Sequence, residues 1–346
     1  MNNKMDIKEI IKAGVFGVIT GDALGVPVEF TSRAERKTDP VTDMREYGTH
    51  SQPKGTWSDD SSMALATMDS IILRGGIRYD DIMEKFEKWL LHGDYTPHGD
   101  TFDVGMTCAK AISRYHKGVD PRECGGKGEY DNGNGSIMRI MPVSLYVGLN
   151  EDYWNKDYLD EAVYDIHGVS CLTHGHPRSQ MGCMIYTSMC HELIYRKNRT
   201  VLETLQCAID RTLEYYSKAW EEYSWFDSEF HKEIKADSYK RLRDLISFGN
   251  LAESEISSGG YVVHTLEAAI WCLLNSDSYA DSVLKAVNLG DDTDTTGAVA
   301  GGLAGLCYGY DSIPKDWIDS VDSKEWIERM CEDLAAVILE RGENKK

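Results

Sequence analysis

Positive charge is scarce in this sequence of 346 residues, in which 37 Lys and Arg residues stand against 57 Asp and Glu residues and leave a formal net charge of -20. Such a charge repels the phosphates of nucleic acids and acidic membranes, which argues against both as partners. A phosphate-bearing ligand would need local compensation, and metal ions can supply it. The acidity alone also has a plainer explanation, because it keeps a protein soluble.

Long apolar runs are missing as well. We find no stretch that approaches the roughly 20 apolar residues of a membrane-spanning helix. The first residues, Met1 to Ile11, mix lysines and acids with apolar side chains and do not resemble a signal peptide. We therefore expect a cytoplasmic protein that does not act on a membrane.

Cysteine pairs and nucleophile motifs are also lacking. The nine cysteines are an odd number and contain no Cys-x-x-Cys pair, which fits neither a disulfide scaffold nor a zinc ribbon. We expect reduced thiols packed in helices. No Gly-x-Ser-x-Gly motif occurs, and no cysteine stands in the context of a nucleophile, so acyl transfer is not supported.

Strand-like alternation is scarce, whereas apolar residues recur at helical spacing in most long segments. Four such stripes are Leu159-Ala162-Val163-Ile166, Met181-Met184-Ile185-Met189, Leu202-Leu205-Ile209-Leu213 and Trp326-Met330-Leu334-Val337-Ile338. We predict an all-α fold in which residues 1–346 form a single compact domain. The stretch 215–258, rich in aromatic and charged residues in its first half, is expected to form a helical excursion from it.

Glycine and proline mark the predicted loops. These are Gly21 to Pro27, Gly48 to Gly55, His92 to Gly105, Gly125 to Gly135, His174 to Pro177, Gly259-Gly260 and Gly290. The first of them ends a predicted helix from Ile7 to Ile19. Farther on, Gly297, Gly301 and Gly305 follow at a spacing of four and would let a second helix approach closely.

Two acidic clusters each stand at the start of a predicted helix: Ser58-Asp59-Asp60 and Asp291-Asp292-Thr293-Asp294-Thr295. Adjacent carboxylates repel one another unless they cap a helix or meet a cation. In the first cluster, capping of the helix by one acid competes with metal binding as the explanation. The second cluster has more acids and hydroxyls than one cap can use. Hydroxyl and carboxylate oxygens suit Mg²⁺ or Mn²⁺, so the two clusters are candidates for one shared site.

Other residues are weaker candidates for binding. The loop Gly133-Asn134-Gly135-Ser136 could cradle phosphate oxygens with its backbone N–H groups, and Arg139 could either add positive charge there or form a buried ion pair. His174 and His176 form a His-x-His pair, but a third zinc ligand at suitable spacing is not evident.

Together these motifs resemble the ADP-ribosylglycohydrolase family, including the dinitrogenase reductase activating glycohydrolases. The resemblance extends from Gly14 to about Gly309 and depends on seven motifs in the family's order. They are Gly21-Asp22-Ala23-Leu24-Gly25 with Glu29, Trp57-Ser58-Asp59-Asp60-Ser61, Phe102-Asp103-Val104-Gly105, Gly133-Asn134-Gly135-Ser136 with Arg139, Leu172-Thr173-His174, Gly260-Tyr261-Val262-Val263-His264-Thr265-Leu266-Glu267 and Asp292-Thr293-Asp294-Thr295.

The resemblance implies a compact orthogonal all-α fold and a metal-dependent hydrolase that cleaves the bond between ADP-ribose and a modified acceptor. It implies two divalent cations, Mg²⁺ or Mn²⁺, held by Ser58, Asp59, Asp60, Asp292, Asp294 and Thr295. Asp103, Glu29 and Asp60 would be catalytic. Gly133, Asn134, Gly135, Ser136, His174 and Tyr261 would bind the substrate. Asp291 departs from the family, where glycine is common, and we expect it to be a neighbour of the site.

The acceptor is an ADP-ribosylated protein or small molecule, and an arginine linkage is our first expectation. We expect a monomer. The segment Tyr215 to Phe230 is expected to shape access to the site. Two alternatives stand beside this reading: a member of the same family that binds ADP-ribose or serves structurally, as the related lens crystallins do, without turnover, and a phosphohydrolase with His174 and His176 among its metal ligands.

Overall fold

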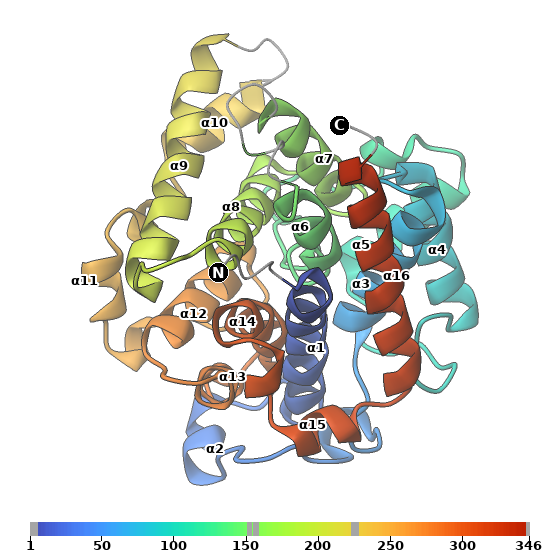
Figure 1. Cartoon of the computed structure of the whole chain (residues 1–346), viewed down its shortest axis with the longest axis vertical. Coiled ribbons are helices and arrows are strands. Elements are labelled where there is room, and N and C mark those ends of the chain that lie inside the picture. The colour runs from blue at the N-terminus through green and yellow to red at the C-terminus, as the bar shows by residue number, and fades with distance from the viewer. Residues whose placement is uncertain (1–5, 151–153, 155–158, 223–227, 344–346) are drawn as a thin grey trace.

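The computed structural model describes residues 6–150, 154, 159–222 and 228–343. Within these ranges the chain is helical and forms no β-strand, with three isolated bridges between loops, so the prediction of an all-α fold is confirmed (Figure 1). The α-helices are α1 Ile7–Gly25, α2 Arg33–Thr38, α3 Asp59–Arg74, α4 Tyr79–His92, α5 Met106–His116, α6 Met141–Gly148, α7 Leu159–Cys171, α8 Pro177–Ile194, α9 Val201–Glu222, α10 Ser228–Ala236, α11 Leu245–Gly249, α12 Val262–Leu274, α13 Tyr279–Val287, α14 Thr293–Tyr308, α15 Lys315–Ser320 and α16 Lys324–Glu343.

Helices α1 and α14 lie side by side at the centre, although they come from opposite ends of the sequence (Figure 1). Glycines allow their backbones to touch. A Cβ atom on Gly21 would lie 2.1 Å from the carbonyl oxygen of Gly297, and one on Gly301 would lie 2.1 Å from that of Gly17. No side chain fits at such distances, so the close approach that we predicted for the glycines of α14 is confirmed.

The predicted end of the first helix is wrong. Helix α1 does not stop at Ile19 but continues through Gly21 to Gly25. The glycines that suggested a loop are instead the contact surface for α14. The prediction of no long apolar run also needs correction. Ile7–Val28 is long and apolar enough to span a membrane by composition, with a mean hydropathy of 1.4 in a window that is 89% buried inside the protein.

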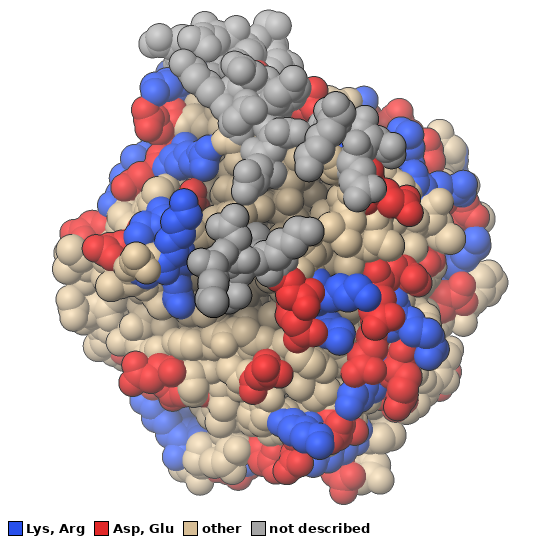
Figure 2. Space-filling view, viewed as in Figure 1, with Lys and Arg blue, Asp and Glu red and all other residues tan. Residues whose placement is uncertain are grey.

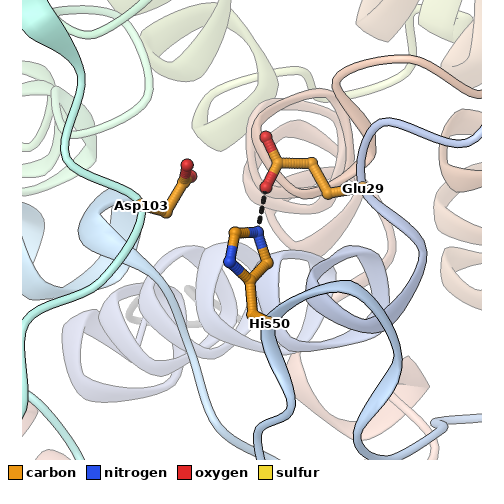
Figure 3. A group of neighbouring side chains, drawn as sticks. All are labelled: Glu29, His50 and Asp103. Carbon is orange, nitrogen blue, oxygen red and sulfur yellow. Dashed lines mark hydrogen bonds and ion pairs between the residues drawn. The ribbon is translucent and has the colours of Figure 1, made fainter.

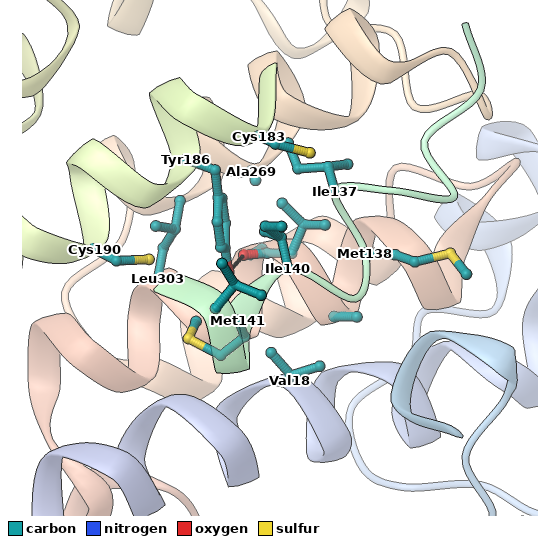
Figure 4. Packing of buried hydrophobic residues seen from close by; sticks show 14 of the residues in the cluster. Val18, Ile137, Met138, Ile140, Met141, Cys183, Tyr186, Cys190, Ala269 and Leu303 are labelled. Atoms are coloured by element: carbon teal, nitrogen blue, oxygen red, sulfur yellow. Dashed lines mark hydrogen bonds between the residues drawn. The ribbon is translucent and has the colours of Figure 1, made fainter. Parts of the chain in front are cut away.

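The buried hydrophobic side chains form one cluster that runs from Ile11 to Ile338. Figure 4 shows a part of it, where Val18 of α1, Met141 of α6, Tyr186 of α8 and Leu303 of α14 pack together. The hydroxyl of Tyr186 donates to the carbonyl oxygen of Val299 at 3.3 Å, which satisfies the polar end of this buried ring.

The described part of 215–258 adds to this cluster. Tyr216, Phe230, Tyr239 and Leu242 are buried, and the ring of Phe230 stacks on that of His167 in α7 with centroids 5.2 Å apart. The apolar side chains of the described part of this segment are therefore part of the common core. Residues 223–227, which belong to the segment expected to shape access to the site, lie outside the described residues.

All nine cysteines are free thiols, as predicted. Cys207 is exposed and is the departure from the expected packing. Acidic and basic side chains are interspersed over the face seen in Figure 2.

Candidate active site

The first acidic cluster begins α3. Ser58 is its N-cap, and its hydroxyl accepts a hydrogen bond from the backbone N–H of Asp60 at 3.3 Å. The hydroxyl, and not a carboxylate as we expected, therefore caps the helix. Asp59 and Asp60 remain available for another partner. Asp60 Oδ1 accepts from the hydroxyl of Thr295 at 3.2 Å, whereas the buried Asp60 Oδ2 has no hydrogen-bond partner.

The second acidic cluster begins α14. Asp292 occupies the N-cap position, but its side chain makes no capping hydrogen bond and accepts instead from the side-chain amide of Asn134 at 2.8 Å. Asp294 Oδ1 accepts from the backbone N–H of Thr295 at 2.8 Å. Asp294 Oδ2 is buried without a partner, like Asp60 Oδ2.

A third segment brings an acid that we did not predict as a site residue. Asp22, on α1, accepts from the backbone N–H groups of Ser58 and Ser61 and from the Ser61 hydroxyl, the last at 2.6 Å. One oxygen each of Asp22, Asp60 and Asp294 lies within 4.8 Å of the others, so these three buried carboxylates could hold a metal ion. Our expectation of a loop at Gly21 hid the role of Asp22, although the Gly21-Asp22 motif was visible.

Glu29 joins the acidic clusters from the turn that follows α1. One oxygen of its carboxylate lies within 4.8 Å of carboxylate oxygens of Asp292 and Asp294. Glu29 forms a second group within the same limit with His50 and Asp103. Figure 3 shows this second arrangement, in which the His50 ring Nε2 meets the Glu29 carboxylate and Asp103 approaches from a separate loop. His50 was not predicted as a site residue, because no motif surrounds it.

Burial dominates the electrostatics of the site. It raises the pKa values of Asp60 and Asp294 well above the usual range, and the neighbouring carboxylates raise them further. Burial also raises the pKa of Asp22 to about 6 and that of Glu29 to about 7, although hydrogen bonds from Ser61 and His50 act in the opposite direction. So many carboxylates in one buried place favour a bound cation over a protein that must protonate them.

The donor set fits divalent cations on an observation independent of charge. Two oxygens, Asp60 Oδ2 and Asp294 Oδ2, are buried without a partner, and a buried acceptor without one is costly. Carboxylate and hydroxyl oxygens are the ligands that Mg²⁺ and Mn²⁺ prefer. The residues present therefore suit such ions.

A cavity of about 370 Å³ opens beside these acids. Its lining brings together most of the predicted site residues: Glu29, Asp59, Asp103, Gly133, Asn134, Gly135, His174, Asp292 and Thr295. Ser58, Asp60 and Asp294 are buried and do not line it.

Two predicted substrate-binding residues, Ser136 and Tyr261, are not among the residues that line the cavity. Ser136 is fully buried, and its hydroxyl accepts from the thiol of Cys183 at 3.5 Å. The ring of Tyr261 lies under the guanidinium of Arg178, with 5.7 Å between that group and the ring centroid. Their direction depends on packing between helices, which the motifs do not reveal.

Comparison with known proteins decides the family. A model of the family described as ADP-ribosylglycohydrolase matches residues 3–344. The chain belongs to the ADP-ribosylglycohydrolase family. It is an ADP-ribosylglycohydrolase, a hydrolase of linkages to ADP-ribose, as the motifs predicted.

Individual relatives agree with this membership. An ADP-ribosylarginine hydrolase Tri1 of Serratia proteamaculans is 31% identical over 93% of this chain and 78% of its own length. An ADP-ribosyl-[dinitrogen reductase] glycohydrolase of Rhodospirillum rubrum is 29% identical over 89% of this chain and 88% of its own. A solved structure titled ADP-ribosylglycohydrolase-related protein complex matches with a TM-score of 0.71 and 26% identity, over 96% of this chain and 99% of that one.

The acid that departs from the family pattern, Asp291, has a structural place in this ADP-ribosylglycohydrolase. Its φ is +63°, in the left-handed region that favours glycine, and its side chain is exposed. Its backbone accepts from Phe30 N–H and donates to the carbonyl oxygen of Thr31, both at 2.7 Å. Asp291 thus holds the segment after Glu29 with its backbone.

Arg139 takes neither of the two roles considered for it, whereas His174 and His176 agree with the lack of a third zinc ligand. Arg139 is fully buried, forms no ion pair among the described residues and does not line the cavity. His176 caps α8, where its Nδ1 accepts from Arg178 N–H at 3.1 Å. Neither His174 nor His176 joins a metal-binding group among the described residues.

Proposed function

We propose that this enzyme removes ADP-ribose from arginine side chains of modified proteins and that two Mg²⁺ or Mn²⁺ ions assist it. The names of two relatives, an ADP-ribosylarginine hydrolase and an ADP-ribosyl-[dinitrogen reductase] glycohydrolase, support the acceptor. Ser58, Asp59, Asp60, Asp292, Asp294 and Thr295 are the proposed ligands, and we add Asp22 to them. The observation that carries this proposal is the pair of partnerless buried oxygens, Asp60 Oδ2 and Asp294 Oδ2.

When bound, such ions fix ribose hydroxyls and lower the pKa of a water molecule. Hydrolysis forms a bond from the water oxygen to the anomeric carbon, breaks the bond from that carbon to the guanidinium nitrogen and transfers a proton to this nitrogen. We assign the proton transfers to Glu29 and Asp103, which line the cavity. Their carboxylates would also stabilise the positive charge that develops on the ribose ring. Asp60 would contribute by holding the ions from its buried position.

The charge of the cavity supports a cationic acceptor. Each Asp, Glu, Lys or Arg that lines it is an acid, namely Glu29, Asp59, Asp103 and Asp292. A guanidinium group is planar and positively charged and pairs with carboxylates in a bidentate manner. The acids that the ions leave free are therefore suited to hold the arginine end of the substrate.

The test is hydrolysis of an arginine-ADP-ribosylated peptide after chelation and after return of Mg²⁺ or Mn²⁺, with release of ADP-ribose measured by mass spectrometry. We expect activity to return with the metal and Asp60→Asn to lower it at least about 100-fold, the order of losing one electrostatic catalytic group. Asp291→Asn is the matched control, because asparagine tolerates a positive φ, and it should retain nearly full activity. Full activity without metal, or in Asp60→Asn, would contradict the proposal.

The same assay examines the alternatives. A protein that only binds ADP-ribose would release none from any acceptor, and a serine-linked or nucleobase-linked substrate cleaved in preference would replace arginine. A phosphohydrolase would release phosphate and lose activity in His176→Ala. The capping role of His176 gives no support to that reading.

We further propose that residues 1–346 form one domain and that the protein is a cytoplasmic monomer that acts away from membranes. The continuous hydrophobic cluster supports the single domain, and the burial of most of the apolar window in Ile7–Val28 supports a role in the core over a membrane span. Light scattering after size exclusion should give one species near 38.9 kDa.

A further inference from the structure

Arg139 lies outside the cavity lining, and its guanidinium group is buried without an ion pair among the described residues. Its side chain is fully buried, and both Nε and Nη1 lack a hydrogen-bond partner. The guanidinium lies over the ring of Phe86, 4.8 Å from its centroid, and no carboxylate pairs with it among the described residues. A buried charge without a counter-ion destabilises a fold. A contribution of Arg139 to the neighbouring site would account for its presence in the core.

The one guanidinium nitrogen that is engaged points to that role. Arg139 Nη2 donates to the carbonyl oxygen of Val169 at 3.1 Å and to the hydroxyl oxygen of Thr173 at 2.7 Å. The same hydroxyl oxygen lies 2.9 Å from Nδ1 of His174. Consecutive hydrogen bonds therefore connect the buried guanidinium of Arg139 through the Thr173 hydroxyl to the imidazole of His174.

The direction of these hydrogen bonds follows from what each group can do. A guanidinium only donates, so Thr173 accepts from Arg139 and keeps its own O–H for another acceptor. The Thr173 hydroxyl also lies near the thiol of Cys108, but sulfur is a weak acceptor, so Nδ1 of His174 is the stronger acceptor within its reach. A neutral imidazole that accepts at Nδ1 carries its proton on Nε2.

Nε2 of His174 lies beside the glycine loop at the cavity. His174 lines the cavity of about 370 Å³, and its Nε2 lies 3.4 Å from the position of a Cβ on Gly133 and 3.3 Å from that of one on Gly135. The imidazole thus closes over the glycine loop. A side chain on either glycine would meet it.

We propose that Arg139 and Thr173 are positioning residues that hold His174 as the neutral Nε2–H tautomer, which offers a hydrogen-bond donor to an oxygen or nitrogen acceptor of the ADP-ribosyl group. The identity of the ligand rests on the proposed function, whereas the tautomer does not.

The electrostatics of the imidazole agree with this geometry. Burial and the positive charge of Arg139 lower the pKa of His174 to about 3. The ring is therefore uncharged at neutral pH, and it contributes a directed hydrogen bond to the ligand.

The test is ¹⁵N NMR of the full-length protein labelled at histidine, in which the chemical shifts of Nδ1 and Nε2 report the tautomer without any turnover. His174→Gln assigns the signal. We expect Nε2–H in the wild type and in Thr173→Ser, and a loss of that preference in Thr173→Val, which keeps the shape but removes the hydroxyl. His167, another fully buried imidazole, should keep its signals in all variants.

Kinetics give the second readout. We expect Thr173→Val to raise KM about ten-fold with little change in kcat, as the loss of one ligand hydrogen bond would, while Thr173→Ser stays near the wild type. His174→Gln retains an N–H donor near Nε2, so adding Thr173→Val to it should cause no further loss. Arg139→Lys and Arg139→Met are compared by circular dichroism, because either variant can fail to fold.

Three outcomes overturn the proposal. They are an Nδ1–H tautomer in the wild type, an unchanged tautomer in Thr173→Val, and a further loss of affinity when Thr173→Val is added to His174→Gln. If the tautomer is Nε2–H but no ADP-ribosylated arginine is hydrolysed, the proposed function fails and the positioning role stands.

Discussion

The residues of the site stand on two kinds of structure, a helix side and a loop side. On the helix side, Asp22, Asp60 and Asp294 belong to helices, and α1 and α14 touch through their backbones. On the loop side, Glu29, Asp103 and the glycine loop stand on connecting segments. Helices in a close-packed core fix the position of a ligand, whereas loops can change in sequence without disturbing that core.

The conformations of the loops sharpen the contrast. Phe30 and Asp103 have φ values of +62° and +50°, although neither is glycine. A bulky residue in the left-handed region stores about 1–3 kcal/mol of strain. Both residues line the cavity, and Phe30 is 68% exposed. The strained residues thus lie where the acceptor is expected to arrive.

The largest effect should come from breaking the helix contact. Gly301→Ala would place a methyl group 2.1 Å from the carbonyl oxygen of Gly17. This oxygen belongs to the backbone of α1, so it cannot move aside as a flexible side chain could. We expect a loss of several kcal/mol in the free energy of unfolding, comparable with strong overpacking of a core, and a loss of metal binding with it. Thermal unfolding and metal titration calorimetry measure the two effects.

Gly259→Ala is the control on the loop side, because no atom lies within 4 Å of the position of its Cβ. It should be close to neutral. Equal damage from the two substitutions would refute the contrast between the sides.

The second effect concerns Asp22. Asp22→Asn replaces an oxygen that accepts from Ser58 and Ser61 with an amide that brings N–H donors to the same place. We expect metal affinity to fall about 10–100-fold, the usual cost at a supporting ligand position, with the helical content retained. Ser61→Ala removes only one of those donors and should lose less. An unchanged affinity in Asp22→Asn would remove this residue from the metal site.

The third effect is a dependence on pH in the metal-free protein. Since burial raises the pKa of Glu29 to about 7 from 4.5, the neutral form stabilises the fold fully below about pH 4.5, and this contribution is lost as the pH rises through about 7. Asp60 and Asp294 act in the same direction. The metal-free protein should lose on the order of 1 kcal/mol between pH 5 and pH 8 more than Glu29→Gln does, because the variant lacks this titrating group.

Differential scanning calorimetry across that range provides the comparison, and addition of Mg²⁺ or Mn²⁺ should abolish most of the difference. Buried neutral histidines such as His174, whose pKa is lowered, increase the stability of the fold as the pH rises. The variant keeps these histidines, so comparison with it cancels their contribution. Equal pH profiles of wild type and Glu29→Gln would contradict the expectation.

The smallest effect should follow substitution of Phe30. Phe30→Gly relieves the positive φ and is expected to stabilise the protein by up to about 1 kcal/mol, whereas Phe30→Ala keeps the strain. Both remove an aromatic face that a guanidinium group can approach, so KM for an arginine-linked peptide should rise a few-fold in each. If KM is unchanged in both, Phe30 does not contact the acceptor.

Much of this site could be predicted because its acids stand in short motifs. Ser58-Asp59-Asp60 and Asp292-Thr293-Asp294-Thr295 contain more oxygens than helix capping needs, and the structure brings both motifs to one place. The helical stripes likewise identified the fold, since their spacing reports burial on one face. The spacing of the glycines in α14 predicted a close contact with another helix, but it did not identify α1 as that helix.

Other features depended on contacts that no local pattern records. Asp22 was hidden because glycines normally end helices, and only the approach of α14 explains why α1 continues through them. His50 comes near Glu29 through the path of a loop. Ser136 and Tyr261 belong to the right motifs but turn toward neighbouring helices. Side-chain direction is decided by packing, and packing by the whole chain.

The contact between α1 and α14 also determines at which stage of synthesis the active site can be completed. The chain is synthesised from its N-terminus, and Asp22 and Asp60 emerge long before Asp294. Until α14 is synthesised, the proposed metal site lacks Asp294. We therefore expect that the nascent protein cannot bind the proposed cations in their final arrangement and that only the nearly completed chain acquires hydrolytic activity.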